Sequence, residues 1–146
     1  MSGQGYNSSM YSLVPLEPVD YLVIGHAAQD LTPSGARLGG TVAFSALTAR
    51  ALGLRVGIVT SVGNETSLTA LDGIPVITIP SEHSTTFENI YFEGGRKQIL
   101  HHCATPIDFV HVPEVWRHAS ILHLGPIAGE VEPSLPKGFS PDLLGL

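Results

Sequence analysis

Asp30 is the carboxylate whose position along the chain best suits ligand binding. It lies in segment 26–38, which separates a short apolar run at 21–25 from a helix-like stretch. The apolar run is typical of a central parallel strand, and ligands of open α/β sheets bind beyond the carboxyl ends of such strands. A carboxylate there can accept two hydrogen bonds, and bonds to a charged group are roughly twice as strong as neutral ones. The alternative interpretation of Asp30 is an Asx-type turn or a helix cap.

Gly39 and Gly40 precede the helix-like stretch and are the second candidate. Residues without side chains at a helix N-terminus let a ligand approach free backbone N–H groups closely. The surrounding sequence is neither a Gly-x-Gly-x-x-Gly dinucleotide fingerprint nor a phosphate loop ending in Gly-Lys-Ser/Thr. The alternative interpretation is that the two glycines only turn the chain.

The histidines and the single cysteine do not suggest a metal or nucleophile site. His101 and His102 are adjacent, but neighbouring residues of a strand point to opposite faces of the sheet. In addition, no cysteine or carboxylate lies at a spacing from them that is typical of a metal site. The other histidines considered are His111, His118 and His123. Cys103 lies in a predicted strand, where a cysteine is usually a small buried hydrophobic residue. We therefore predict no metal ligands and no nucleophilic cysteine.

A predicted helix and strand position these candidates. Thr41, Ser45 and Thr48 form one narrow polar stripe at helical spacing. Apolar residues cover most of the remaining circumference, so we expect a helix that is buried on most sides. Gly53 stands where a helix C-cap belongs, and the apolar run at 56–62 predicts the next strand.

The rest of the chain predicts an α/β class with a mostly parallel sheet flanked by helices. We expect strands at 74–79 and 120–124, short helices at 64–72 and 113–119, and an antiparallel hairpin at 85–91 and 97–102. Residues 1–16 are predicted to be a loose tail, and residues 17–146 to form the folded part. The last residues, 132–146, end in an apolar strand-like run, which we interpret as a sign of truncation.

Composition limits the functional classes. The chain has 146 residues, 43% of them hydrophobic, and a formal net charge of −6 with seven Lys and Arg, none of them clustered. This length suits about one domain with its own core. The acidic balance argues against nucleic acid or an anionic membrane surface as a partner. The sequence has a single cysteine and no secretion signal. It also has no apolar run that approaches the roughly 20 residues of a membrane helix. We therefore predict a cytoplasmic protein.

The spacing of small residues resembles a known family, the ribokinase-like or PfkB-type sugar and nucleoside kinases. The Gly39–Gly40 pair is followed by Ala46, Gly53 and Gly63 at the family's separations. The chain departs from the pattern at Phe44, where the family has an asparagine, and at Val42, where a smaller residue is usual. The resemblance implies a mostly parallel sheet with a small β lid, built here from segments 31–38 and 85–102. It also implies that this chain is the N-terminal, substrate-side part of such a domain.

The resemblance further implies how the candidate residues act. Asp30 follows Gly25 by the five residues that the family shows, and would hold hydroxyl groups of the substrate. The full set of expected substrate-binding residues is Asp30, Gly39, Gly40, Thr41 and Phe44. Phe44 cannot replace the hydrogen bonds of an amide but can stack on a sugar face or a base, so sugar and nucleoside both remain open. ATP and Mg²⁺ are the implied donor and metal, and the lid sheet is the implied surface of a homodimer.

The family's second signature, a Gly-Ala-Gly-Asp-like stretch with the catalytic base and an anion hole, is not found in the sequence. Losing a general base alone costs about 10²- to 10⁴-fold in rate, so we expect no turnover by this chain alone and assign it no catalytic residue. The alternative function is a non-catalytic polyol-binding module, or a half-domain that pairs with a separate nucleotide-binding chain. An unrelated α/β nucleotide-binding domain is disfavoured because residues 26–29 do not form a phosphate loop.

Overall fold

The structure is a computed structural model that describes residues 15–146. The predicted loose tail, residues 1–16, therefore lies almost entirely outside the described residues. Among the described residues, no helix has both the length and the apolar character needed to cross a membrane.

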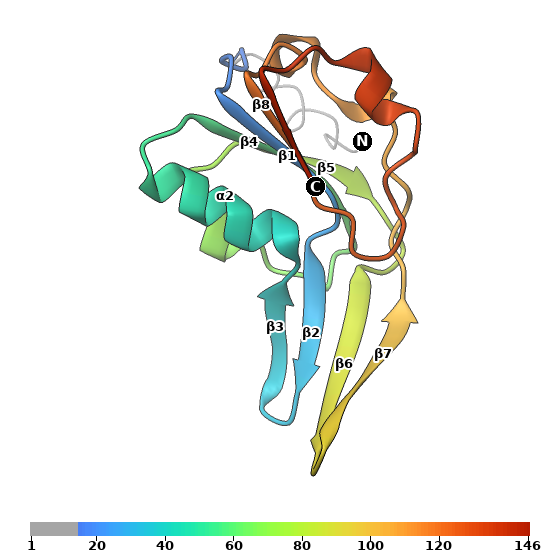
Figure 1. Cartoon of the computed structure of the whole chain (residues 1–146). Helices are drawn as coiled ribbons and strands as arrows, with labels where there is room; N and C mark the ends of the chain where they lie inside the picture. Colours follow the sequence, from blue (N-terminus) through green and yellow to red (C-terminus); the bar gives the residue numbers. More distant parts are fainter. Residues whose placement is uncertain (1–14) are drawn as a thin grey trace, which may run out of the picture.

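A five-stranded parallel sheet forms the centre of the molecule, in the order β5-β4-β1-β8-β9 (Figure 1). Its strands are β1 (Tyr21–Ile24), β4 (Val56–Val62), β5 (Val76–Pro80), β8 (Ile121–Leu124) and β9 (Leu143–Gly145). β1 is central and pairs in parallel with both β4 and β8. The predicted α/β class with a mostly parallel sheet is confirmed. The apolar run at the chain end is β9, which pairs with β8.

A second, four-stranded sheet extends from the end of the first, in the order β3-β2-β6-β7 (Figure 1). Its strands are β2 (Ala28–Thr32), β3 (Gly35–Gly39), β6 (Thr85–Phe92) and β7 (Gly95–His102). The sheet consists of two antiparallel hairpins that are joined by parallel pairing of β2 with β6. The β6–β7 hairpin was predicted and is confirmed. Segment 26–38 was predicted as an insertion whose residues 31–38 contribute to the lid, and most of it forms the other hairpin.

Helix α2 (Thr41–Ala51) covers one face of the central sheet (Figure 1). Val42, Ala43, Ala46 and Ala49 are its buried residues. The prediction that the helix is buried on most sides is wrong, because Phe44 is 63% exposed and Leu52, just beyond the helix, is 76% exposed. The helix packs on the sheet along one stripe, and in the described structure nothing covers its outer side.

The two faces of the central sheet carry separate hydrophobic clusters. On the α2 face, Val42 and Ala46 pack with Val23 and Ile58. On the opposite face, Trp116 is fully buried with Leu22 and other apolar residues. Its ring packs closely over Gly57, where a Cβ would lie 3.1 Å from the ring. Trp116 is thus a core residue.

The two predicted short helices are reduced to single 3₁₀ turns. These are η1 (Thr69–Leu71) in segment 64–72 and η3 (Glu114–Trp116) in segment 113–119; similar turns are η2 (Phe109–His111) and η4 (Leu135–Gly138). Segments this short do not repay the cost of helix nucleation, so only one turn forms where a Leu or Trp anchors it.

Candidate functional site

A cavity of about 580 Å³ lies between the N-terminal end of α2 and the four-stranded sheet. Asp30, Gly40, Thr41 and Phe44 all line it. A second cavity of about 800 Å³ adjoins it and shares Asp30, Phe44 and Asn89. We call the two together the acceptor cavity. Four of the five residues singled out from the sequence therefore lie at one site, and the fifth, Gly39, adjoins it.

Asp30 enters the cavity from β2. Its carboxylate packs directly against Gly39, where a Cβ would overlap it, so the glycine makes room for the acid. Partial burial raises the pKa of the Asp30 carboxyl group, and no hydrogen bond or positive charge within the described chain offsets that rise. The carboxylate is thus half-buried and free to accept hydrogen bonds from a ligand.

Gly40 is the residue before the first helical residue of α2 and has φ +91° and ψ 150°. That conformation is essentially restricted to glycine. A Cβ at this position would also lie 2.6 Å from the carbonyl oxygen of His26. Gly40 therefore turns the chain in a conformation that other residues avoid, and the same conformation brings the backbone to the cavity wall. No side chain caps the helix, which leaves its first N–H groups accessible.

Phe44 lies where the two parts of the acceptor cavity meet, and it lines both. A ring that is 63% exposed on the outside of a helix is not needed for core packing. It provides an apolar surface at the cavity mouth, on which the face of a sugar ring or a base can stack.

The four-stranded sheet contributes polar residues that sequence reasoning missed. Asn89, Gln98 and Arg96 line the cavity from β6 and β7. Asn89 and Gln98 are cross-strand partners, and alternation places Phe87 on the same face. The Oδ1 atom of Asn89 is buried and has no hydrogen-bond partner in the described part of the chain. The alternation of residues 87, 89 and 91 could have indicated this face if the strand register had been known.

Glu130 fixes the loop that closes the cavity beside Ile127. The side chain is 3% exposed. Its carboxylate accepts hydrogen bonds from the backbone N–H groups of His26 at 2.9 Å, Ile127 at 3.0 Å and Ala128 at 2.8 Å. Glu130 could not be recognised from the sequence, because a single glutamate in a loop has no distinguishing spacing. In the fold it ties the segment after β8 to the end of β1.

His26 ties the two sheets together at the base of the cavity. Its Nε2 lies 2.8 Å from the carbonyl oxygen of Thr105 and its Nδ1 lies 2.6 Å from the hydroxyl of Thr85. A carbonyl can only accept, so Nε2 carries the hydrogen and Nδ1 accepts from Thr85. Burial lowers the pKa of His26, and the Thr105 carbonyl and the charge of Glu130 oppose that shift only partly. The ring is therefore a neutral structural link.

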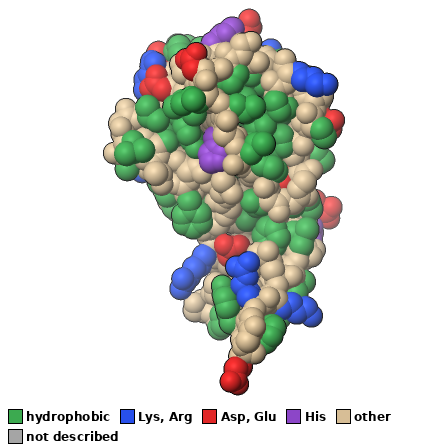
Figure 2. Space-filling view, viewed as in Figure 1, with side chains coloured by type: hydrophobic (Ala, Val, Ile, Leu, Met, Phe, Trp, Pro, Cys, Tyr) green, Lys and Arg blue, Asp and Glu red, His purple; other side chains and the backbone are tan. Residues whose placement is uncertain are grey.

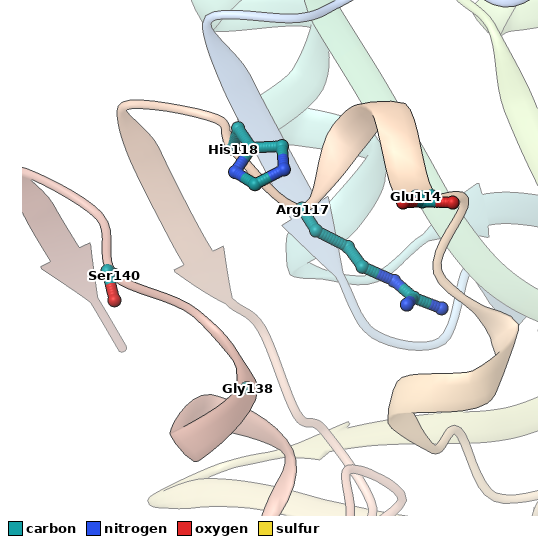
Figure 3. A pocket seen from close by; sticks show the side chains of 5 residues that line it. All are labelled: Glu114, Arg117, His118, Gly138 and Ser140. Carbon is teal, nitrogen blue, oxygen red and sulfur yellow. The ribbon is translucent and has the colours of Figure 1, made fainter.

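A separate cavity of about 360 Å³ lies beside the start of β8 and includes Glu114, Arg117 and His118 (Figure 3). Arg117 is held by the fold: its Nε–H donates to the carbonyl oxygen of Val112 at 3.0 Å, and its guanidinium lies 4.3 Å from the centre of the Phe109 ring. Because the cavity lies at the amino end of a parallel strand, it is not placed where such folds bind ligands.

Comparison with known proteins identifies the fold. No protein-family model matches the chain, and no curated protein matches it. Solved structures do match. A pyrophosphate-dependent kinase in the ribokinase family, complexed with a pyrophosphate analog and myo-inositol, has a TM-score of 0.61 and 22% identity over 82% of this chain and 46% of that one. A sulfate complex of a pyrophosphate-dependent kinase in the ribokinase family has a TM-score of 0.63 and 21% identity, covering 82% of this chain and 48% of the other.

The fructokinase of Halothermothrix orenii is also similar, with a TM-score of 0.55 and 17% identity over 72% of this chain and 45% of the fructokinase. The chain spans less than half the length of each of these structures. The predicted resemblance to ribokinase-like kinases is confirmed at the level of the fold, which is the ribokinase-like fold.

Proposed function

We propose that the acceptor cavity binds a sugar or nucleoside and presents one of its hydroxymethyl groups for phosphoryl transfer. The observation that carries this proposal is the convergence of Asp30, Gly40, Thr41 and Phe44 on one cavity. Two of its acceptors, the Asp30 carboxylate and the Oδ1 atom of Asn89, have no hydrogen-bond partner in the described part of the chain. The fold is shared with sugar kinases, including a fructokinase and an enzyme solved with myo-inositol, which supports the proposal.

Each part of the cavity has a separate task in this proposal. Asp30 accepts hydrogen bonds from two substrate hydroxyls, and Asn89 Oδ1 accepts another. The glycine pair lets the substrate approach the free N–H groups at the start of α2. The four-stranded sheet acts as the lid and excludes water, which otherwise competes with the hydroxyl for the phosphoryl group.

No step of the proposal passes through a metal or nucleotide. Residues 15–146 contain no group of three or more His, Cys, Asp or Glu side chains that could hold a metal ion. We assign none of the described residues to Mg²⁺ or ATP. The family resemblance implies ATP as donor, whereas two of the similar structures are pyrophosphate-dependent kinases, so a transfer assay must include both donors.

Asp30→Asn is expected to weaken sugar or nucleoside binding by about 10- to 100-fold, because hydrogen bonds to a charged group contribute roughly 1.5–3 kcal/mol. Isothermal titration calorimetry of the whole chain with fructose, ribose, myo-inositol and adenosine measures this change. Asp72→Asn is the matched control, since Asp72 is exposed just beyond η1 and does not line the cavity. Equal affinity of Asp30→Asn and the unaltered chain for every compound that binds would contradict the proposed role.

The alternative is binding without transfer, either as a polyol-binding module or as a half-domain that needs a separate nucleotide-binding chain. The sequence has no Gly-Ala-Gly-Asp-like stretch, which favours this alternative for residues 1–146 on their own. Incubation of the chain with a bound polyol, Mg²⁺ and either ATP or pyrophosphate separates the two functions. Phosphorylated product would support transfer by this chain, and binding without product would support the alternative.

The outer face of the lid sheet is the proposed surface of a homodimer. Phe92 lines neither part of the acceptor cavity and is 59% exposed near the end of β6. Burying this side chain against a second copy would remove it from water. Sedimentation velocity of the unaltered chain and of Phe92→Glu tests this: we expect a dimer that the charge disrupts, and a monomer at high concentration would contradict it.

A further inference from the structure

The four-stranded sheet forms a narrow lobe that projects from the wider body of the molecule (Figure 2). Within residues 15–146, four chain connections join this lobe to the body. Residues 25–27 lead from β1 into β2, Gly40 leads from β3 into α2, residues 81–84 lead from β5 into β6, and residues 103–106 leave β7. Contacts among these connections therefore decide how the lobe is held against the body.

His26 lies where the four connections meet. It belongs to the first of them, and its side chain is completely buried. Its ring accepts a hydrogen bond from the hydroxyl of Thr85, at which the third connection ends, and donates one to the carbonyl oxygen of Thr105 in the fourth. Its own carbonyl oxygen packs against Gly40, where a Cβ would lie only 2.6 Å away. One residue thus holds all four connections at the base of the lobe.

The hydrogen bonds around Thr85 suit a neutral His26 ring. The Oγ1 atom of Thr85 accepts from the backbone N–H of Ala104 at 3.0 Å, while its O–H donates to Nδ1 of His26. A protonated ring carries a hydrogen on both nitrogens and can accept on neither. Two hydrogens would then face each other at this contact unless the Thr85 hydroxyl turned away. Protonation therefore disrupts the contact between His26 and Thr85.

Glu130 is the group among the described residues whose charge acts on the His26 ring. Its carboxylate accepts from the backbone N–H of His26 at 2.9 Å. The other elements around His26 present uncharged groups: Thr85 from β6, Thr105 beyond β7, and the hydroxyl of Thr60 from β4, which accepts from the N–H of Ala27. Burial lowers the pKa of the ring below the ordinary histidine value, and the charge of Glu130 opposes this only partly.

We propose that His26 is a pH-sensitive lock: the neutral ring holds the lobe against the body, and protonation of the ring releases it. The release is local, because the hydrogen bonds that the ring loses join the lobe connections and none of them joins two strands of the central sheet. The acceptor cavity lies between α2 and the lobe, so release opens it. The lock does not depend on what the cavity binds, since it acts in the unliganded chain.

The direction of the pH dependence follows from the lowered pKa of the locked ring. In the released lobe the ring is exposed and recovers the ordinary pKa of about 6.5. The lock is therefore complete above that pH and weakens as the pH falls below it, because release takes up a proton. Uptake of one proton makes release about 3- to 10-fold more favourable at pH 5.5 than at pH 7.5.

Amide hydrogen exchange of the whole unliganded chain, corrected for the intrinsic exchange rate at each pH, tests the lock. The N–H groups of Ala27 and Ala104 report release, because they bond to Thr60 and Thr85 at the base of the lobe. The N–H group of Ile58, bonded to the carbonyl of Pro75 in the central sheet, reports global unfolding. We expect protection at Ala27 and Ala104 to fall about 3- to 10-fold from pH 7.5 to 5.5. We also expect it to be lower than at Ile58 and less sensitive to urea. Equal protection and urea dependence at the three amides would overturn the lock, since the lobe would then leave only when the whole chain unfolds.

His26→Gln keeps a donor that can reach the Thr105 carbonyl but cannot take up a proton. In this variant the change in protection at Ala27 between the two pH values is expected to disappear. His123→Gln is the matched control: burial also lowers the pKa of His123, but its ring contacts Tyr21 within the central sheet, so the change at Ala27 should remain. A pH dependence at Ala27 that persists in His26→Gln would assign it to other groups and overturn the inference.

Thr85→Val is the second variant and carries the test if His26→Gln does not fold. It removes the hydroxyl from which Nδ1 of His26 accepts and leaves the ring in place. Loss of that hydrogen bond is expected to lower protection at Ala27 about fivefold at pH 7.5 and to reduce its pH dependence. Unchanged protection of Ala27 at both pH values would contradict the lock.

Discussion

Glu130→Ala is expected to lower the free energy of unfolding by roughly 3–5 kcal/mol. The carboxylate is buried and accepts hydrogen bonds from the N–H groups of His26, Ile127 and Ala128. Removing it leaves three backbone donors without their acceptor, and an unpaired buried donor costs about 1–3 kcal/mol. A loss of this size is a large part of the roughly 5–15 kcal/mol by which ordinary domains are stable.

Urea unfolding followed by circular dichroism measures this loss. Glu130→Gln keeps one acceptor oxygen and is expected to lose less than the alanine variant. Glu132→Ala removes an exposed carboxylate two residues away and is the matched control, with a change within about 0.5 kcal/mol. If Glu130→Ala were as stable as Glu132→Ala, the hydrogen bonds that hold the loop to the end of β1 would not exist as described.

Gly40→Ala is expected to cost about 2–4 kcal/mol in unfolding free energy and to abolish measurable binding in the acceptor cavity. Two effects add. The backbone conformation at φ +91° and ψ 150° is strained for any residue with a Cβ, which costs of order 1–3 kcal/mol. The new methyl group would also lie 2.6 Å from the His26 carbonyl oxygen, which pushes the start of α2 away from β1.

Gly53→Ala is the control for this prediction. Gly53 follows the same helix and also has a positive φ of 88°, but a Cβ added there would meet nothing within 4 Å. It should therefore show only the backbone penalty, about 1–2 kcal/mol, and unchanged binding. Equal destabilisation by the two substitutions would show that the contact with His26 is unimportant.

The strands of the central sheet could be predicted from the sequence because they are continuous apolar runs between glycines and prolines. Strands β2 and β3 could not. Their residues, Ala28–Thr32 and Gly35–Gly39, are mostly polar or small and form no apolar run. They are strands because they pair with each other and with β6, and that pairing is a tertiary property.

The site residues that lie next to the end of a predicted strand or helix were also predictable. Asp30 and the glycine pair were found because the carboxyl end of a strand and the start of a helix are recognisable in sequence. Asn89 and Arg96 were not found, because their direction depends on the register of β6 with β7. That register shifts at Thr86 and Phe87, and a shift of one residue turns every following side chain to the other face.

The burial of α2 was mispredicted for a similar reason. Apolar residues at helical spacing indicate a stripe that can be buried. They do not indicate whether another element of the fold covers that stripe. Phe44 and Leu52 are exposed because the central sheet contacts only the stripe that contains Val42 and Ala46. At Phe44 that exposure places an aromatic ring at the cavity mouth.

Amide chemical-shift mapping of the whole chain tests the central claim most directly, namely that the acceptor cavity binds a polyhydroxylated molecule. Two-dimensional ¹H–¹⁵N spectra are recorded during titration with fructose, ribose, myo-inositol and adenosine. We predict saturable shifts at Asp30, Gly40 and Asn89 for at least one compound, with Arg117 and His118 in the separate cavity unchanged. Shifts confined to Arg117 and His118, or no saturable shift for any compound, would contradict the account.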